Sequence, residues 1–215
     1  MTQRGRTDLL TGVISAVMGV SLLVLLLAGA PPRQLESPRL LIGGPGDQRS
    51  PSWMPDGKRI VCSSAAERFP AGLYLFDLAS GTSRPLTRDP SGHNNPAVSP
   101  DGRRILFHSD RGGQSDIYGL DLATSEVVQL TTNRANDSFA AWSPDGRQIA
   151  YCGGPMKEGH ANLWIMNADG TGQRPLTERG KWDDFDPAFS PDGKRIAFES
   201  NGNGTFGIWV IKSEF

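Results

Sequence analysis

Cysteine and histidine are scarce in this sequence, and neither sign of charge is in excess. The chain has 2 cysteines and 3 histidines, and its 22 basic and 23 acidic residues leave a net charge of -1. Such a chain has no long-range field that attracts nucleic acid or an anionic membrane surface, and no basic stripe interleaved with aromatics is present. The composition therefore argues against a nucleic-acid-binding protein.

Local signatures of catalysis are also missing. The sequence contains no Gly-x-Ser-x-Gly nucleophile elbow and no pair of closely spaced zinc-ligand motifs. Asp183, Asp184 and Asp186 crowd one segment, but their spacing is not that of a calcium loop. We therefore predict a protein that is not an enzyme, with no catalytic residue, no metal site and no cofactor.

The N-terminus carries the one long apolar run. Residues 9–30 contain no charge and, as a helix rising about 1.5 Å per residue, would be long enough to cross a membrane. Arg4 and Arg6 precede the run, which predicts a cytoplasmic N-terminus over residues 1–8 and a chain that crosses outward.

Two fates of this segment stay open. It is either an uncleaved signal-anchor, giving a single-pass transmembrane helix, or a signal peptide cleaved to leave a secreted or periplasmic protein. Pro31 and Pro32 directly follow the small residues where cleavage would fall, which favours the anchor. In both cases the rest of the chain is predicted on the periplasmic or extracytoplasmic side, after a Pro-rich linker over residues 31–38.

One unit recurs four times in the remaining chain. The tripeptide Pro-Asp-Gly begins at Pro55, Pro100, Pro144 and Pro191, at spacings of 45, 44 and 47 residues. Proline presets φ in the turn and glycine accepts a positive φ, so each tripeptide predicts a tight hairpin. β-rich runs flank each hairpin, and a third strand follows with an aromatic at a fixed place, namely Tyr74, Tyr118, Trp164 and Trp209.

A fourth strand ends in Leu-Thr and contains Pro85 or Pro175 in two copies, which predicts that it lies at the sheet edge because proline cannot donate to a ladder. Four antiparallel strands per unit of about 45 residues are typical of a propeller blade. The fold class predicted is an all-β, four-bladed β-propeller of antiparallel four-stranded blades over residues 39–215, preceded by the transmembrane or signal helix.

The fourth copy contains no outer strand after residues 208–211. Residues 39–42 stand in the register of residues 84–87, so we predict that they pair with the 208–211 strand and close the ring, which removes an exposed edge. The same register places Cys62 and Cys152 on opposite faces of strands in non-neighbouring blades. An intrachain disulfide is therefore not expected.

Residues 189–198 read Phe-Ser-Pro-Asp-Gly-Lys-Arg-Ile-Ala-Phe, and other copies of the unit contain the segments Leu163–Gly170 and Arg-Pro-Leu-Thr at 174–177. This pattern closely resembles the TolB-like (WD-like) propeller repeat. This resemblance covers about residues 39 to 215. It implies a bacterial exported protein that binds proteins or ligands, and in TolB itself it would imply membership of the envelope Tol–Pal system. TolB-type propellers normally carry six blades and an N-terminal α/β domain, so the chain is TolB-like in its repeats only. It is either a minimal four-blade ring or a partial ring that completes itself as a homo-oligomer.

Polar and aromatic side chains gather ahead of each inner strand and in the loops of the same face, where propellers commonly bind their partners. We predict a binding surface for an envelope protein or peptide there. Its candidate residues are His93, Asn94, Asn95, His108, Asp137, Asp184, Phe185, Asp186 and Glu199. Two alternatives remain open: a propeller hydrolase or lyase with an axial polar site, and a truncated family member with a structural role only.

Overall fold

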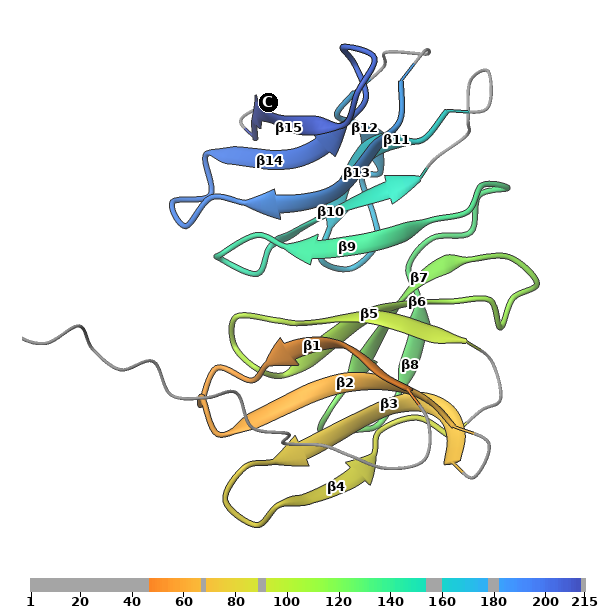
Figure 1. Ribbon diagram of the computed structural model, residues 1–215, viewed down its shortest axis with the longest axis vertical. Coiled ribbons are helices and arrows are strands. Elements are labelled where there is room, and N and C mark those ends of the chain that lie inside the picture. Colours follow the sequence, from red (N-terminus) through yellow and green to blue (C-terminus); the bar gives the residue numbers. More distant parts are fainter. Residues whose placement is uncertain (1–46, 67–68, 89–91, 154–159, 178–181, 214–215) are drawn as a thin grey trace, which may run out of the picture. The chain divides into compact units, whose positions relative to one another are not determined.

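A computed structural model describes residues 47–66, 69–88, 92–153, 160–177 and 182–213, and these residues form strands and turns without a helix. The strands fall into four antiparallel sheets that follow one another along the chain, from β1–β4 (orange to yellow in Figure 1) to β13–β15 (blue). Their bounds are β1 Asp47–Trp53, β2 Arg59–Ala66, β3 Phe69–Asp77, β4 Thr82–Pro85, β5 His93–Val98, β6 Arg104–Ser109, β7 Asp116–Asp121, β8 Val127–Gln129, β9 Ser138–Trp142, β10 Gln148–Gly153, β11 Asn162–Asn167, β12 Arg174–Pro175, β13 Asp184–Phe189, β14 Arg195–Ser200 and β15 Gly207–Lys212.

The strand order confirms the repeat predicted from the sequence. Three sheets have four strands each in sequence order, and β13, β14 and β15 form a three-stranded sheet. The strands with Pro85 and Pro175, β4 and β12, lie at sheet edges as expected. At the other edge of each sheet, β1 contacts β5, β5 contacts β9 and β9 contacts β13. We call β1, β5, β9 and β13 the inner strands; within the described chain, β1 and β13 do not contact each other.

Each Pro-Asp-Gly tripeptide forms the predicted hairpin between the first and second strand of its sheet. Gly102 has a φ of 71° and donates its N–H to the carbonyl of Ser99, which closes the turn. The side chain of Ser99 donates to Asp101 at 2.6 Å and accepts the N–H of Arg104 at 2.9 Å, so one hydroxyl joins the turn to the next strand. The turns at Ser143 and Ser190 repeat both contacts.

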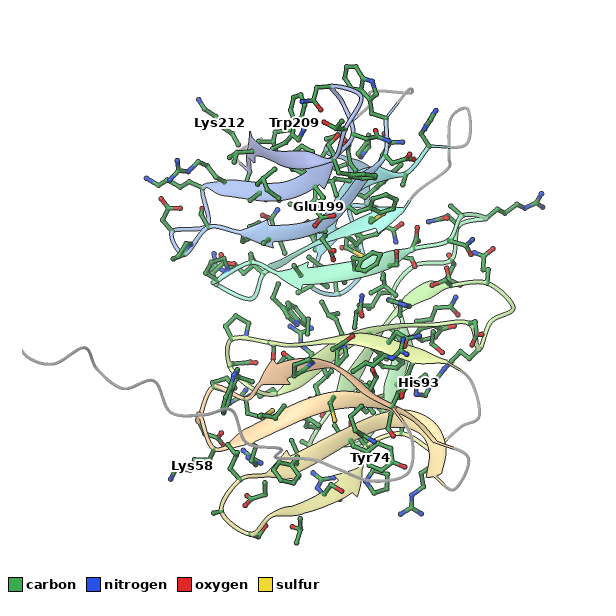
Figure 2. The ribbon with its side chains drawn as sticks, in the orientation of Figure 1. Lys58, Tyr74, His93, Glu199, Trp209 and Lys212 are labelled. Carbon is green, nitrogen blue, oxygen red and sulfur yellow. The ribbon has the colours of Figure 1, made fainter. Side chains whose placement is uncertain are left out.

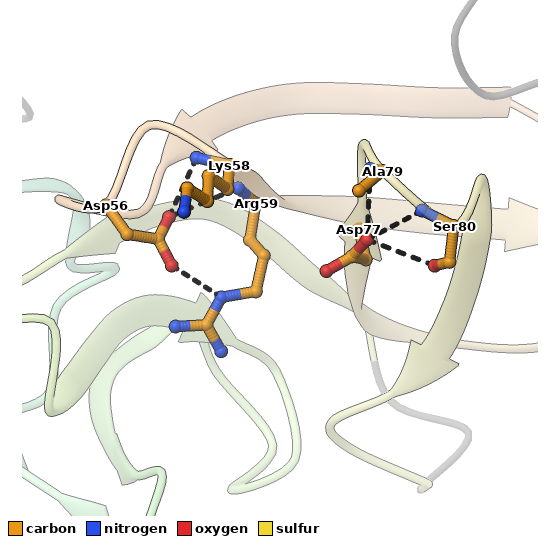
Figure 3. A network of polar contacts seen from close by, with 6 residues as sticks. All are labelled: Asp56, Lys58, Arg59, Asp77, Ala79 and Ser80. Carbon is orange, nitrogen blue, oxygen red and sulfur yellow. Dashed lines mark hydrogen bonds and ion pairs between the residues drawn. The ribbon is translucent and has the colours of Figure 1, made fainter.

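The first sheet departs from this pattern because Met54 stands where the other copies have serine. Asp56 compensates: its Oδ1 accepts the backbone N–H groups of Lys58 and Arg59, and its Oδ2 pairs with the Arg59 guanidinium at 2.7 Å (Figure 3). Met54, which replaces the serine, packs in the core between the first two sheets.

A buried threonine fastens the outer strand of three sheets. Leu73, Ile117 and Leu163 each donate their backbone N–H to a threonine Oγ1 at 2.9 Å. The acceptors are Thr87, Thr131 and Thr177, the threonines of the repeated Leu-Thr pairs. The threonine of each Leu-Thr pair therefore contributes a buried hydrogen bond to the sheet.

The core is divided into three clusters, one between each pair of successive sheets, and each joins aliphatic side chains of one sheet to an aromatic-bearing face of the next. At the second cluster, Trp142 donates its Nε1–H to the carbonyl of Ala97 in the preceding sheet at 3.1 Å. Arg104 lies over the same ring, 4.7 Å from its centroid, and donates to the carbonyl of Ala168.

One face of the last sheet is exposed, because no sheet follows it among the described residues. Trp209 and Ile211 of β15 pack against the third core cluster, whereas the alternate residues Ile208 and Val210 are 74% and 61% exposed. Cys62 and Cys152 lie in β2 and β10 as free, buried thiols, so no disulfide joins them.

The expectations for residues 1–8, 9–30, 31–38 and 39–42 lie outside the described residues. The described strands and turns contain no helix of the length and apolarity that a membrane crossing needs.

Candidate binding face at the inner strands

Every inner strand carries a bulge at the same place in the repeat. The register shifts between Arg49 and Ser52 in β1, and shifts of the same kind interrupt the pairing of β5, β9 and β13 with their neighbours. At each bulge one non-glycine residue has a left-handed backbone: Ser50, Asn95, Phe139 and Asp186, with φ of 52°, 49°, 52° and 49°. This conformation is uncommon for a residue with a side chain and costs on the order of 1 kcal/mol. Its repetition shows that the fold imposes it.

The four bulges line one pocket with a volume of about 440 Å³, which we call the axial pocket. Ser50, Asn95, Phe139 and Asp186 all contribute to its wall, together with Pro51, Pro96 and Pro187. Ser50 donates its hydroxyl to Oδ1 of Asn95 at 2.7 Å, which joins the first sheet to the second. The volume falls in the range of sites for small ligands or single side chains.

A row of rings passes this pocket at Phe139 and extends over three sheets. His108 of β6 lies 5.9 Å from Phe139, Phe139 lies 6.3 Å from Phe185, and Phe185 lies 6.2 Å from Phe206, all measured between ring centroids. We call His108, Phe139, Phe185 and Phe206 the aromatic row. Phe206, in the hairpin between β14 and β15, is 60% exposed. The spacings are typical of edge-to-face and offset ring contacts.

Two exposed carboxylates accompany the row in the last sheet. Glu199 of β14, labelled in Figure 2, is the register partner of Phe185. Asp186 follows Phe185 in β13. Desolvation raises the pKa of Asp186, and the negative charge of Glu199 raises it further. Burial lowers the pKa of His108 below its ordinary value of 6.5, against a smaller opposing effect of Asp110, so the imidazole is neutral at pH 7.

The structure divides the candidate residues predicted from the sequence into two groups. Six of them lie at the bulges or in the strands directly beside them: Asn94, Asn95, His108, Phe185, Asp186 and Glu199. The other three, His93, Asp137 and Asp184, are 3%, 0% and 0% exposed and are enclosed within the sheets.

His93 makes structural contacts through both ring nitrogens. Arg111 lies 2.7 Å from Nε2, and because a guanidinium can only donate, Nε2 accepts. Nδ1 therefore carries the proton and donates to Thr87 at 2.8 Å. This histidine links the outer strand of the first sheet to the second.

The two buried aspartates differ in their surroundings. Asp137 accepts a hydrogen bond from Asn133 at 2.7 Å and packs against Gly153, where a Cβ atom would overlap its carboxylate. Neither carboxylate oxygen of Asp184 has a hydrogen-bond partner among the residues that the structure describes.

The acidic segment places the carboxylates of Asp183, Asp184 and Asp186 in different surroundings. Asp183 turns toward β11, where it accepts the Ala161 N–H and lies 3.3 Å from His160. Asp184 is buried and Asp186 is exposed, so the three carboxylates have separate surroundings. Over the described ranges, no group of three or more histidine, cysteine or acidic side chains is placed to hold a metal ion.

Ser50, Phe139 and Phe206 are not among the nine candidate residues predicted from the sequence, although Ser50 and Phe139 belong to the polar and aromatic segments ahead of the inner strands. The repeat period contained the signal for the first two, since Ser50 and Phe139 stand in register with Asn95 and Asp186. Phe206 lies in a hairpin whose Gly202, Gly204 and Gly207 have the spacing of a nucleotide-binding loop. A strand follows this hairpin, whereas phosphate binding requires a helix N-terminus there.

Comparison with known proteins agrees with this architecture. The family model of the TolB beta propeller domain matches residues 37–156. The chain is 31% identical over 158 residues to a protein of Bacillus subtilis named "Uncharacterized peptidase YuxL", covering 73% of this chain and 22% of that protein. It is also 31% identical over 164 residues to the Tol-Pal system protein TolB of Francisella tularensis, covering 75% of this chain and 37% of TolB.

The crystal structure of TolB from Acinetobacter baumannii superposes with a TM-score of 0.69 at 26% identity, over 82% of this chain and 44% of that chain. The matched region thus spans less than half the length of each of these relatives. The family model covers more than half of the sequence and the sheets follow the same repeat, so the chain belongs to the TolB β-propeller domain family.

Proposed function

We propose that this chain is an exported binding module of the cell envelope, held in the membrane by residues 9–30, whose axial pocket and aromatic row receive a protein or peptide partner. The observation that carries the proposal is the set of four bulges, which aim the left-handed residues of successive sheets into one pocket. Strained backbone positions cluster at binding and catalytic sites because the surrounding fold must hold them there. The likeness to TolB supports a protein partner in the envelope.

A propeller enzyme is the second candidate, favoured by the similarity to a protein named as a peptidase. A hydrolase or lyase would need a general base or acid at the axis. Of the candidates for such a role, His93 is engaged through both ring nitrogens and Asp137 is buried and hydrogen bonded. The aromatic row has the chemistry of a contact surface, so binding is the function that the geometry supports best.

The outer strand of the last sheet is the second element of the proposal. We propose that residues 39–42 pair with β15 and complete this sheet, as β4, β8 and β12 complete the others. The alternative is assembly with a second copy, which the exposed Ile208 and Val210 favour because their counterparts in the first three sheets are covered by a following sheet. Sedimentation of the detergent-solubilised chain distinguishes the two: a monomer supports strand pairing within the chain, and a concentration-dependent dimer supports assembly.

Site-specific photocrosslinking in intact cells tests the binding function. A photoreactive benzoylphenylalanine replaces Phe206, which is 60% exposed in the aromatic row. The control replaces Trp53, the last residue of β1, which is 58% exposed and lines neither the axial pocket nor the row. We expect a discrete crosslinked protein from position 206 and none of the same mass from position 53. Equal crosslinking at both positions, or none at 206, would contradict the proposal. Resistance of the chain to alkaline extraction from membranes tests the anchor separately.

A further inference from the structure

We propose that the axial pocket and the aromatic row recognise cationic side chains, lysine or arginine, presented at alternate positions of an extended peptide segment. This inference rests on the proposed binding function and adds the chemistry of the partner. It follows from three independent features of the face: its charge, its rings and the spacing between those rings.

The negative charge exposed at this face lies on the fourth sheet, in β13 and β14. Asp186 and Glu199 are both exposed, and they lie close enough for the charge of one to act on the other. His108, at the other end of the row, is neutral at pH 7 and so adds no opposing charge. A cation is the complement of this surface.

The rings supply the second part of a cation site. A guanidinium or ammonium within about 6 Å of a ring centroid is attracted by the electron-rich face. This chain uses that contact internally, with Arg104 over Trp142 at 4.7 Å and Arg111 over Tyr118 at 4.9 Å. None of the cation–ring contacts between described residues involves the aromatic row, whose rings contact one another instead.

The spacing of the rings indicates an extended segment. Successive centroids along the row are 5.9, 6.3 and 6.2 Å apart. Side chains on one face of a β-strand repeat every two residues, about 6.6 Å, so alternate side chains of an extended peptide would meet successive rings. Lysine and arginine suit such a surface because their aliphatic stems lie along apolar rings while the charged group reaches a carboxylate.

The test uses the full chain in a zwitterionic detergent, labelled with 4-fluorophenylalanine. The probes are heptapeptides Gly-Ser-X-Ser-X-Ser-Gly, in which X is lysine, arginine, or the neutral analogues norleucine and citrulline. Fluorine NMR signals of Phe139, Phe185 and Phe206 are assigned by single Phe→Leu substitutions. We expect the lysine and arginine peptides to shift these signals and to bind at least about tenfold more tightly than their neutral counterparts, about 1.4 kcal/mol.

Charge-removing variants locate the effect. Asp186→Asn combined with Glu199→Gln should abolish the tenfold preference, and asparagine tolerates the left-handed backbone at position 186 about as well as aspartate does. The control is Glu126→Gln, which removes one exposed carboxylate from the turn before β8 and should leave the preference unchanged. Equal binding of charged and neutral peptides, or loss of the preference in Glu126→Gln, would overturn the inference. If position 206 captures a partner in cells while the peptides show no preference for charge, the binding function stands and the cation inference fails.

Discussion

Thr131→Val removes one hydroxyl, with its two hydrogen bonds, from the interior of the second sheet. Thr131 is fully buried; its Oγ1 accepts the N–H of Ile117 at 2.9 Å, and its hydroxyl donates a longer hydrogen bond of 3.4 Å to Oδ1 of Asp116. Valine has nearly the same shape, so packing is kept while the N–H loses its acceptor. A buried donor left without a partner costs about 1–3 kcal/mol. Against a total stability of about 5–15 kcal/mol, this loss is large enough to measure from a single site.

Urea denaturation gives the magnitude. With a slope of about 2 kcal/mol per molar urea, a loss of about 2 kcal/mol lowers the unfolding midpoint by about 1 M. Thr177→Val, which removes the equivalent contact to Leu163, should behave alike. The matched control is Thr124→Val: this hydroxyl accepts the N–H of Glu126 at an exposed turn, where water replaces it, and the change should stay within about 0.5 kcal/mol.

Hydrogen exchange provides the local readout for this prediction. The amide of Ile117 should lose protection selectively in Thr131→Val, because its hydrogen-bond acceptor has gone while the neighbouring ladder remains. If Thr131→Val proved no less stable than Thr124→Val, or if the Ile117 amide kept its protection, the reasoning that these threonines secure the outer strands would be wrong.

Three further changes test the rest of the fold. Trp142→Phe loses the hydrogen bond to Ala97 and weakens the stacking of Arg104, and a loss of about 1–2 kcal/mol is expected in thermal or urea unfolding; an unchanged midpoint would show that this contact contributes nothing. Gly153→Ala places a Cβ atom against the Asp137 carboxylate at a φ of 154°, so circular dichroism should show a strongly destabilised chain, whereas Gly204→Ala, which meets no atom in its turn, should fold with a smaller loss. If residues 39–42 complete the last sheet, the double variant Arg39→Cys with Val210→Cys should form a disulfide under mild oxidation, because the corresponding residues Arg84 and Leu75 of the first sheet pair directly. The control, Arg39→Cys with Lys212→Cys, should form no disulfide.

The repeat was predictable because its determinants are local. Pro-Asp-Gly specifies a hairpin within three residues, and the fixed aromatics Tyr118 and Trp164 mark the third strand of each unit, so the strands and the proline-bearing edges followed from the text alone. The three core clusters likewise arise from alternating apolar residues that strand periodicity makes visible.

The burial of His93, Asp137 and Asp184 was not predictable in this way. These polar residues precede the apolar part of each inner strand and look like loop residues, but their partners come from distant positions, such as Thr87 and Arg111 for His93. The bulges could not be predicted from the sequence for a different reason. Ser50, Asn95, Phe139 and Asp186 share a backbone conformation and no residue type, so no sequence motif marks them.

Asp186 links the stability of the fold to the proposed site, and Asp186→Asn tests that link. Desolvation, and then the charge of Glu199, raises the folded-state pKa of Asp186 above its ordinary value of 3.8. An acid with a raised folded-state pKa is harder to ionise in the folded chain, so its charge lowers stability at neutral pH, and the penalty disappears as pH falls below both pKa values. Asp186→Asn should therefore be more stable than the natural chain at pH 7, with the difference shrinking toward pH 3 in urea denaturation. Glu199→Gln should give part of the same gain, since it removes the second cause of the shift. If this carboxylate belongs to the binding face, the same substitution should also weaken the binding of lysine and arginine peptides. If Asp186→Asn were less stable at pH 7, the carboxylate would be a structural group, and its place in the binding face would lose this support.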